Sequence, residues 1–171
     1  MALQDLLLIT QDDIRIYRPT ATLNDKSIEP FIREAQRHDL KPVLGDALYR
    51  DMLENLTTEK YSDLLNGKSY LHNAQSVYYE GIKPMLAYYS LARYIKSAPV
   101  KANRMGVVKK ISEQSEPSSV AEINGEVNIL RSNALDYQNG VILFLRNNPT
   151  VYPLYGGNNG ARITSFNFFK G

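Results

Sequence analysis

The side chains best suited to metal binding and nucleophilic catalysis are scarce in this sequence. The chain has no Cys and only two His, His38 and His72, among its 171 residues. Neither histidine has a second His or Cys at metal-ligand spacing, so both are expected at the surface or at helix ends. Asp12 and Asp13 suit the first turn of a helix better than a catalytic pair. No phosphate-binding or nucleophile motif occurs. We therefore expect no catalytic site, metal or cofactor, and a protein that is not an enzyme.

A basic stretch is the best candidate for a contact with nucleic acid. Residues 96–110 hold several cations and no acidic residue. Lysine and arginine neutralise phosphates, but aromatic residues that would stack on bases are missing from this stretch. The formal net charge of the whole chain is only +2, which argues against a tight grip on DNA. Two interpretations stay open, a solvated loop or a contact surface made of Lys101, Arg104, Lys109 and Lys110.

The tyrosines and the C-terminal tail point to protein contacts. Twelve Tyr stand against no Trp, and tyrosine is favoured at interfaces because its ring is apolar and its hydroxyl is polar. Use in an ordinary core is the alternative. Residues 163–169 have strand character, and a lone strand needs an edge to pair with. The predicted subunit interface consists of Tyr152, Leu154, Tyr155, Ile163, Phe166, Phe168 and Phe169.

Helices must position these residues. Ser119 and Glu122 match a capping box, and the apolar residues that follow recur at alternating spacings of three and four. This pattern predicts a helix over 119–147 with a heptad-like seam of Val120, Ile123, Val127, Leu130, Ala134, Tyr137, Val141 and Phe144.

Shorter helices are expected before it. The apolar spacing and the capping residues predict helices after Thr10 and over 24–39, 42–56, 58–66 and 75–97. The last of these should kink near Ile82 and be buried on several sides, since it is apolar nearly all round. Residues 99–118 are expected to form a loop or a hairpin.

The expected fold class is mainly α. We predict a bundle of about four or five helices over 1–155, with the insertion at 99–118, and an extended arm over 156–171. The N-terminus lacks the basic and apolar regions of a signal peptide. No apolar stretch is long enough to span a bilayer. A soluble protein made in a cytoplasm, without membrane contact, is therefore expected.

Several strings resemble those of a known group of proteins. They are residues 31–36 (FIREAQ), 39–49 (DLKPVLGDALY), 79–94 (YEGIKPMLAYYSLARY) and 106–117 (GVVKKISEQSEP). With the order of the helices, they resemble the head–tail connector, adaptor or head-completion proteins of tailed bacteriophages, and above all the ring proteins of crAss-like phages. The resemblance extends over residues 5–155.

The resemblance implies a structural role in the neck of a virion. Such proteins form a ring, usually of twelve copies, between the portal protein and the next neck or tail ring. They extend the DNA channel and touch the passing DNA only transiently. The expected partners are copies of the same chain, the portal and other neck proteins. A nucleic-acid-binding module that uses residues 101–110 is the alternative.

Overall fold

The computed structural model describes residues 6–19, 25–97, 100–103, 106–109 and 120–156. They form a mainly helical fold, which confirms the predicted fold class. Two separate two-stranded antiparallel hairpins accompany the helices. The elements are α1 (Gln11–Tyr17), α2 (Asp25–Ala35), a π-helical turn η2 (Gln36–Leu40), α3 (Lys41–Leu44), α4 (Asp46–Glu54), α5 (Glu59–Asn66), β1 (Lys68–His72), β2 (Gln75–Tyr79), α6 (Lys83–Ser97), β3 (Val100–Asn103), β4 (Gly106–Lys109) and α7 (Val120–Asn147).

The first helix is capped as its sequence predicts. The Thr10 hydroxyl accepts a bond from the Asp13 N–H at 3.3 Å, and the Asp13 carboxylate accepts one from the Thr10 N–H at 2.8 Å. This reciprocal capping box satisfies donors that a helix start otherwise leaves unpaired. Asp13 also accepts a hydrogen bond from Lys83 of α6 at 2.9 Å, so the same carboxylate ties α1 to α6.

The sequence predicted a break between a helix over 24–39 and a helix over 42–56. The structure instead has a continuous helical path through Lys41 and Pro42. Pro42 lacks an N–H, and its ring would clash with the carbonyl four residues earlier in a regular α-helix. A π-turn precedes it, in which the Lys41 N–H donates to the Gln36 carbonyl. The wider turn lets the chain pass into α3 without a loop. Gly45, at φ 79°, then separates α3 from α4.

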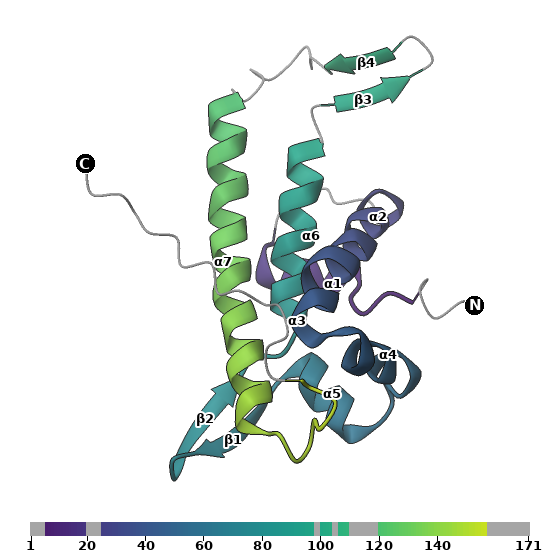
Figure 1. The fold of residues 1–171 in the computed structure, drawn as a ribbon. Coiled ribbons are helices and arrows are strands. Elements are labelled where there is room, and N and C mark those ends of the chain that lie inside the picture. Colours follow the sequence, from purple (N-terminus) through teal and green to yellow (C-terminus); the bar gives the residue numbers. More distant parts are fainter. Residues whose placement is uncertain (1–5, 20–24, 98–99, 104–105, 110–119, 157–171) are drawn as a thin grey trace.

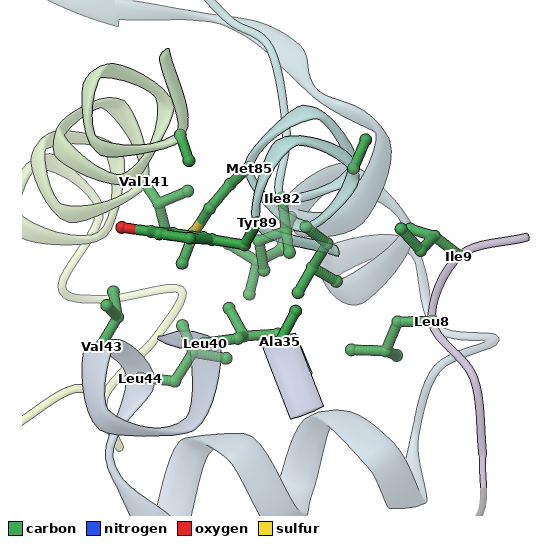
Figure 2. Packing of buried hydrophobic residues seen from close by; sticks show 14 of the residues in the cluster. Leu8, Ile9, Ala35, Leu40, Val43, Leu44, Ile82, Met85, Tyr89 and Val141 are labelled. Carbon is green, nitrogen blue, oxygen red and sulfur yellow. The ribbon is translucent and has the colours of Figure 1, made fainter. Parts of the chain in front are cut away.

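Helix α6 forms the centre of the fold. It packs against α1, α2 and α7, and most of its residues from Pro84 to Ala92 are buried. The expectation of a helix buried on several sides is confirmed. Figure 2 shows Met85 and Tyr89 of α6 beside Val141 of α7, with Leu8 and Ile9 of the N-terminal segment on the same cluster.

The N-terminal segment is held by one buried amide. Gln36 is 3% exposed, and its Oε1 accepts a bond from the Leu8 N–H at 2.8 Å. Its Nε2 donates to the Leu6 carbonyl at 2.9 Å. Because its oxygen and its nitrogen both form hydrogen bonds, the cost of burying the amide is offset and the side chain fixes the segment on the core.

The long helix α7 confirms the predicted seam over most of its length. Val127, Leu130, Ala134, Val141 and Phe144 are buried. Val120 is 65% exposed, so the seam does not extend to the first turn. Figure 1 shows the reason, since α7 begins beyond the end of α6 and its first turn has no helix beside it. Ser119 lies outside the described residues.

Residues 68–79 correct the prediction of a helix that starts at residue 75. They form the β1–β2 hairpin, with Ser69 opposite Tyr78 and Tyr70 opposite Val77. Helix α6 begins only at Lys83, and Pro84 lies in its first turn, where the missing N–H costs no bond within the helix. The second hairpin, β3–β4, falls within the segment for which a loop or a hairpin was expected.

Candidate interaction site

Two glycines place the β1–β2 hairpin against the helices. Gly67 ends α5 with φ 93°, and Gly81 precedes α6 with φ 89°. Both values lie in the left-handed region that glycine occupies without strain. The chain segments cross so closely there that the Ile82 N–H reaches the Leu64 and Leu65 carbonyls at 3.1 Å each. The crossing holds the hairpin beside the C-terminal half of α7.

A hollow of about 490 Å³ lies between the hairpin, α6 and α7. We call it the tyrosine groove, because tyrosines supply the largest share of its lining. Its volume falls within the usual range for binding sites. The lining residues are Tyr70, Val77, Tyr78, Tyr79, Glu80, Gly81, Tyr88, Asn133, Asp136, Tyr137, Gly140 and Leu143.

Two lining tyrosines, Tyr70 and Tyr79, pack on the buried ring of Phe144, which lies beneath the groove. Phe144 of α7 lies parallel to Tyr79, with ring centres 4.1 Å apart, and meets Tyr70 edge-on at 5.1 Å. The Tyr79 hydroxyl donates to the Leu64 carbonyl at 2.8 Å. Burial raises the pKa of Tyr79 well above its usual value, so this hydroxyl stays a neutral donor. The floor is therefore a rigid part of the core.

A second pair of rings forms one wall. Tyr88 of α6 and Tyr137 of α7 are stacked, with ring centres 5.6 Å apart. The Tyr88 hydroxyl donates to the Tyr17 carbonyl at 3.4 Å. Burial and the charge of the nearby Glu80 raise the pKa of Tyr137. The stacking and the Tyr88 bond hold the two rings together, and both residues remain half-buried.

The rim of the groove is exposed and carries negative charge. Tyr78 is 66% exposed and Leu143 is 51% exposed. Glu80 and Asp136 are the charged residues of the lining, and neither forms an ion pair within the described part of the chain. Aromatic faces beside carboxylates attract cations and apolar groups together. The groove thus suits a peptide that combines aromatic and basic side chains.

The predicted subunit interface is corrected at Tyr152. This ring is only 2% exposed, packs against Tyr61 and Phe144, and donates from its hydroxyl to the Lys60 carbonyl at 2.7 Å. It is a core residue, because the turn after α7 folds back onto α5. Leu154 is 47% exposed and Tyr155 is half-buried. The other four predicted residues, Ile163, Phe166, Phe168 and Phe169, lie outside the described residues.

The basic candidates lie in and around the second hairpin. Lys101 of β3 pairs with Val108, and Lys109 of β4 pairs with Val100. Arg104 and Lys110 lie outside the described residues. Figure 1 shows this hairpin at the end of the α6–α7 pair opposite to β1–β2. The basic hairpin and the tyrosine groove are therefore separate surfaces.

No group of three or more His, Asp or Glu that could hold a metal ion is found among the described residues. His38 lies in η2 and His72 ends β1, far apart in the chain. A smaller hollow contains Arg93, but this guanidinium is bound to Asp39 at 2.7 Å. That ion pair joins α6 to η2 and leaves Arg93 engaged within the fold.

A comparison with known protein families assigns most of this chain to one family. The family described as a family of unknown function, DUF6712, matches residues 40–165. This match extends over more than half of the chain. The chain belongs to the DUF6712 family. No curated protein and no solved structure matches it.

The matched range includes every residue that lines the tyrosine groove of this DUF6712 protein. It also includes the β3–β4 hairpin and α7, whereas α1 and α2 precede it. None of the helices described here has the length and apolar character needed to cross a membrane.

Reasoning from the sequence missed the groove because it missed the first hairpin. Signals for the hairpin were present in the sequence of this DUF6712 chain. Gly67 and Gly81 flank the segment, and Pro84 marks a helix start. Between them, Asn73 and Ala74 form the turn with positive φ angles of 50° and 61°.

Proposed function

We propose that this DUF6712 protein is a structural virion subunit that forms a ring between the portal and the tail of a tailed bacteriophage. In that role it extends the DNA channel, offers a platform to the next neck protein and catalyses no reaction. The strings that resemble connector proteins support the phage setting. The observation that carries the assembly role is the tyrosine groove, an aromatic surface that the described chain leaves uncovered.

The exposed residues around the groove support this role. Tyr78 and Leu143, which line the groove, are 66% and 51% exposed. Exposed apolar patches on a folded chain mark interaction surfaces more often than they mark inert ones. Covering these side chains with a partner would remove their apolar area from water.

The arrangement of the two hairpins also supports assembly with more than one neighbour. They lie at opposite ends of the α6–α7 pair (Figure 1). A subunit in a ring needs contact surfaces for adjacent copies and for the proteins above and below it. Two separated hairpins provide distinct edges for such contacts.

The oligomeric state tests the proposal directly. Light scattering and negative-stain electron microscopy would be applied to the purified full chain, alone and mixed with the portal protein of the same phage. We expect rings, most simply of twelve copies, formed alone or on the portal. A chain that stays monomeric and does not bind the portal would overturn the proposal.

A nucleic-acid-binding module is the second candidate. It is favoured by the position of Lys101 and Lys109 on a hairpin at one end of the molecule. This function predicts DNA binding that weakens steeply with salt and falls on Lys109→Ala and Lys110→Ala. Arg146→Ala, at the opposite end of α7, is the matched control. No measurable binding at low salt would remove this candidate.

A further inference from the structure

We propose that residues 157–171 of a neighbouring copy dock in the tyrosine groove. The inference rests on the proposed self-assembly and names the surfaces that make the contact. The segment and the groove match in three respects, which are aromatic content, charge and spacing.

The charges are complementary. Residues 157–171 contain Arg162 and Lys170 and no acidic residue. The groove lining contains Glu80 and Asp136 and no Lys or Arg. Opposite charges at a contact steer association and fix its register. Both carboxylates are exposed, so a basic segment reaches them without opening the fold.

The spacing of the segment matches an extended peptide with one binding face. In an extended chain, residues two apart point to the same side. Phe166, Phe168 and Lys170 then share a face, and Arg162 lies on the same side. Two rings flanked by two cations fit a groove with an aromatic floor and a carboxylate-bearing rim. Ile163 and Phe169 point to the other side.

The place where the described chain ends indicates that the segment in the groove comes from a neighbouring copy. Tyr152 is bound to the Lys60 carbonyl of α5 at 2.7 Å, which holds the turn after α7 on that side. Figure 1 shows this turn directed toward α5, whereas the β1–β2 hairpin lies on the other side of the end of α7. The described chain therefore ends on the α5 side of α7, away from the side on which the β1–β2 hairpin lies, and we assign the groove to the segment of a second copy.

The test uses full-length variants and measures assembly by analytical ultracentrifugation. Asp136→Lys places a cation in the groove, at an exposed helix position where substitution leaves the fold intact. Phe166→Ala with Phe168→Ala removes the rings of the segment. We expect each variant to weaken self-association by about tenfold or more.

Matched controls separate this contact from general effects. Glu54→Lys makes the same change in net charge on α4 and gives up only an exposed ion pair with Arg50, of a kind that contributes little to stability. Ile163→Ala with Phe169→Ala removes two apolar side chains from the opposite face of the segment. Both controls are expected to assemble nearly as the unmodified chain does. Circular dichroism of every variant verifies that the helices are retained.

A mixing experiment tests whether the segment of one copy binds the groove of another. The Asp136→Lys chain retains a competent segment, and the Phe166→Ala, Phe168→Ala chain retains a competent groove. If the segment docks on a neighbour, the mixture forms pairs at concentrations at which each variant alone is largely monomeric. A mixture that stays monomeric would overturn the inference, because an intact segment and an intact groove would then be present together without binding each other.

The remaining outcomes separate this inference from the proposed function. If the unmodified chain forms rings and the Asp136→Lys chain forms them equally well, the groove assignment fails and the connector role stands. The groove assignment also fails, and the connector role stands, if the Asp136→Lys chain does not assemble while the Phe166→Ala, Phe168→Ala chain assembles normally. If the unmodified chain neither associates nor binds the portal, both proposals fail.

Discussion

Gly67 and Gly81 lie next to each other where the chain enters and leaves the β1–β2 hairpin, and each is in close contact with the backbone of the other's segment. A Cβ on Gly67 would lie 2.4 Å from the Tyr79 carbonyl oxygen, and one on Gly81 would lie 2.5 Å from the Leu65 carbonyl oxygen. Both are backbone atoms that no side-chain rotation can move away. The tyrosine groove depends on this crossing, because it sets the position of the hairpin beside α7.

Replacing Gly81 by alanine should therefore destabilise the fold. The substitution adds a methyl group where the backbone has no room and places a Cβ at φ 89°. We expect a loss of about 2–4 kcal/mol in the free energy of unfolding. Urea denaturation of the full chain measures it. Gly125→Ala in α7 is the control, because its Cβ meets nothing within 4 Å and alanine favours a helix, so that variant should gain roughly 0.5–1 kcal/mol.

Phe144 should be among the most costly residues to truncate. Its ring contacts Tyr70, Tyr79 and Tyr152. Phe144→Ala removes these contacts at a buried site and should cost about 3–5 kcal/mol. The neighbouring Leu143 is 51% exposed, and Leu143→Ala should change stability by no more than about 0.5 kcal/mol. Thermal or urea unfolding of the two variants side by side provides the comparison, and similar losses would contradict the assignment of Phe144 to the core.

Tyr152 offers a test of its reassignment from the interface to the core. Tyr152→Phe keeps the ring but removes the bond to the Lys60 carbonyl, which should cost about 1 kcal/mol. Tyr152→Ala should cost about 3–5 kcal/mol, as for other buried aromatic residues. Leu154→Ala, at an exposed neighbour, should be close to neutral. If Tyr152→Ala left unfolding unchanged and affected only assembly, the original interface prediction would stand.

Asp13 should make stability depend on pH at the acidic end. Burial is the largest single influence and raises its pKa, but the bonds from Lys83 and from Thr10 together outweigh it, so the pKa lies below the usual 3.8. The ionised form is thus favoured by folding. Its contribution is present above the unfolded pKa and is lost as the pH falls through the lower folded pKa.

The measurement is the difference in unfolding free energy between the unmodified chain and Asp13→Asn. At about pH 7 the unmodified chain should be more stable by roughly 1–2 kcal/mol, through the cap and the contact with α6. The difference should shrink as the pH falls below the usual pKa of 3.8 and through the lower folded pKa. An advantage that grew on acidification would contradict the direction of the pKa shift.

Local patterns in the sequence were sufficient for the elements whose signals are regular. The three-and-four spacing predicted α7, the near-continuous apolar character of residues 85–95 predicted the central α6, and Thr10 with Asp13 predicted the start of α1. These features follow from helical geometry and end-capping, which depend on residues only a few positions apart. The scarcity of histidine and the lack of cysteine also shaped the expectation that the chain works through contacts.

The tertiary structure decided the features that depend on distant residues. Residues 75–79 contain β-branched and aromatic side chains beside a helical segment, and their strand form is settled by pairing with β1 and by the crossing of Gly67 and Gly81. Tyr152 became a core residue because α5 supplies both the ring of Tyr61 and the carbonyl of Lys60. The tyrosine groove has the same origin, since rings from a hairpin and two helices meet only after the chain folds. Spacing along the sequence therefore determined the main helices, whereas packing between distant segments determined which aromatic residues became core and which formed a surface.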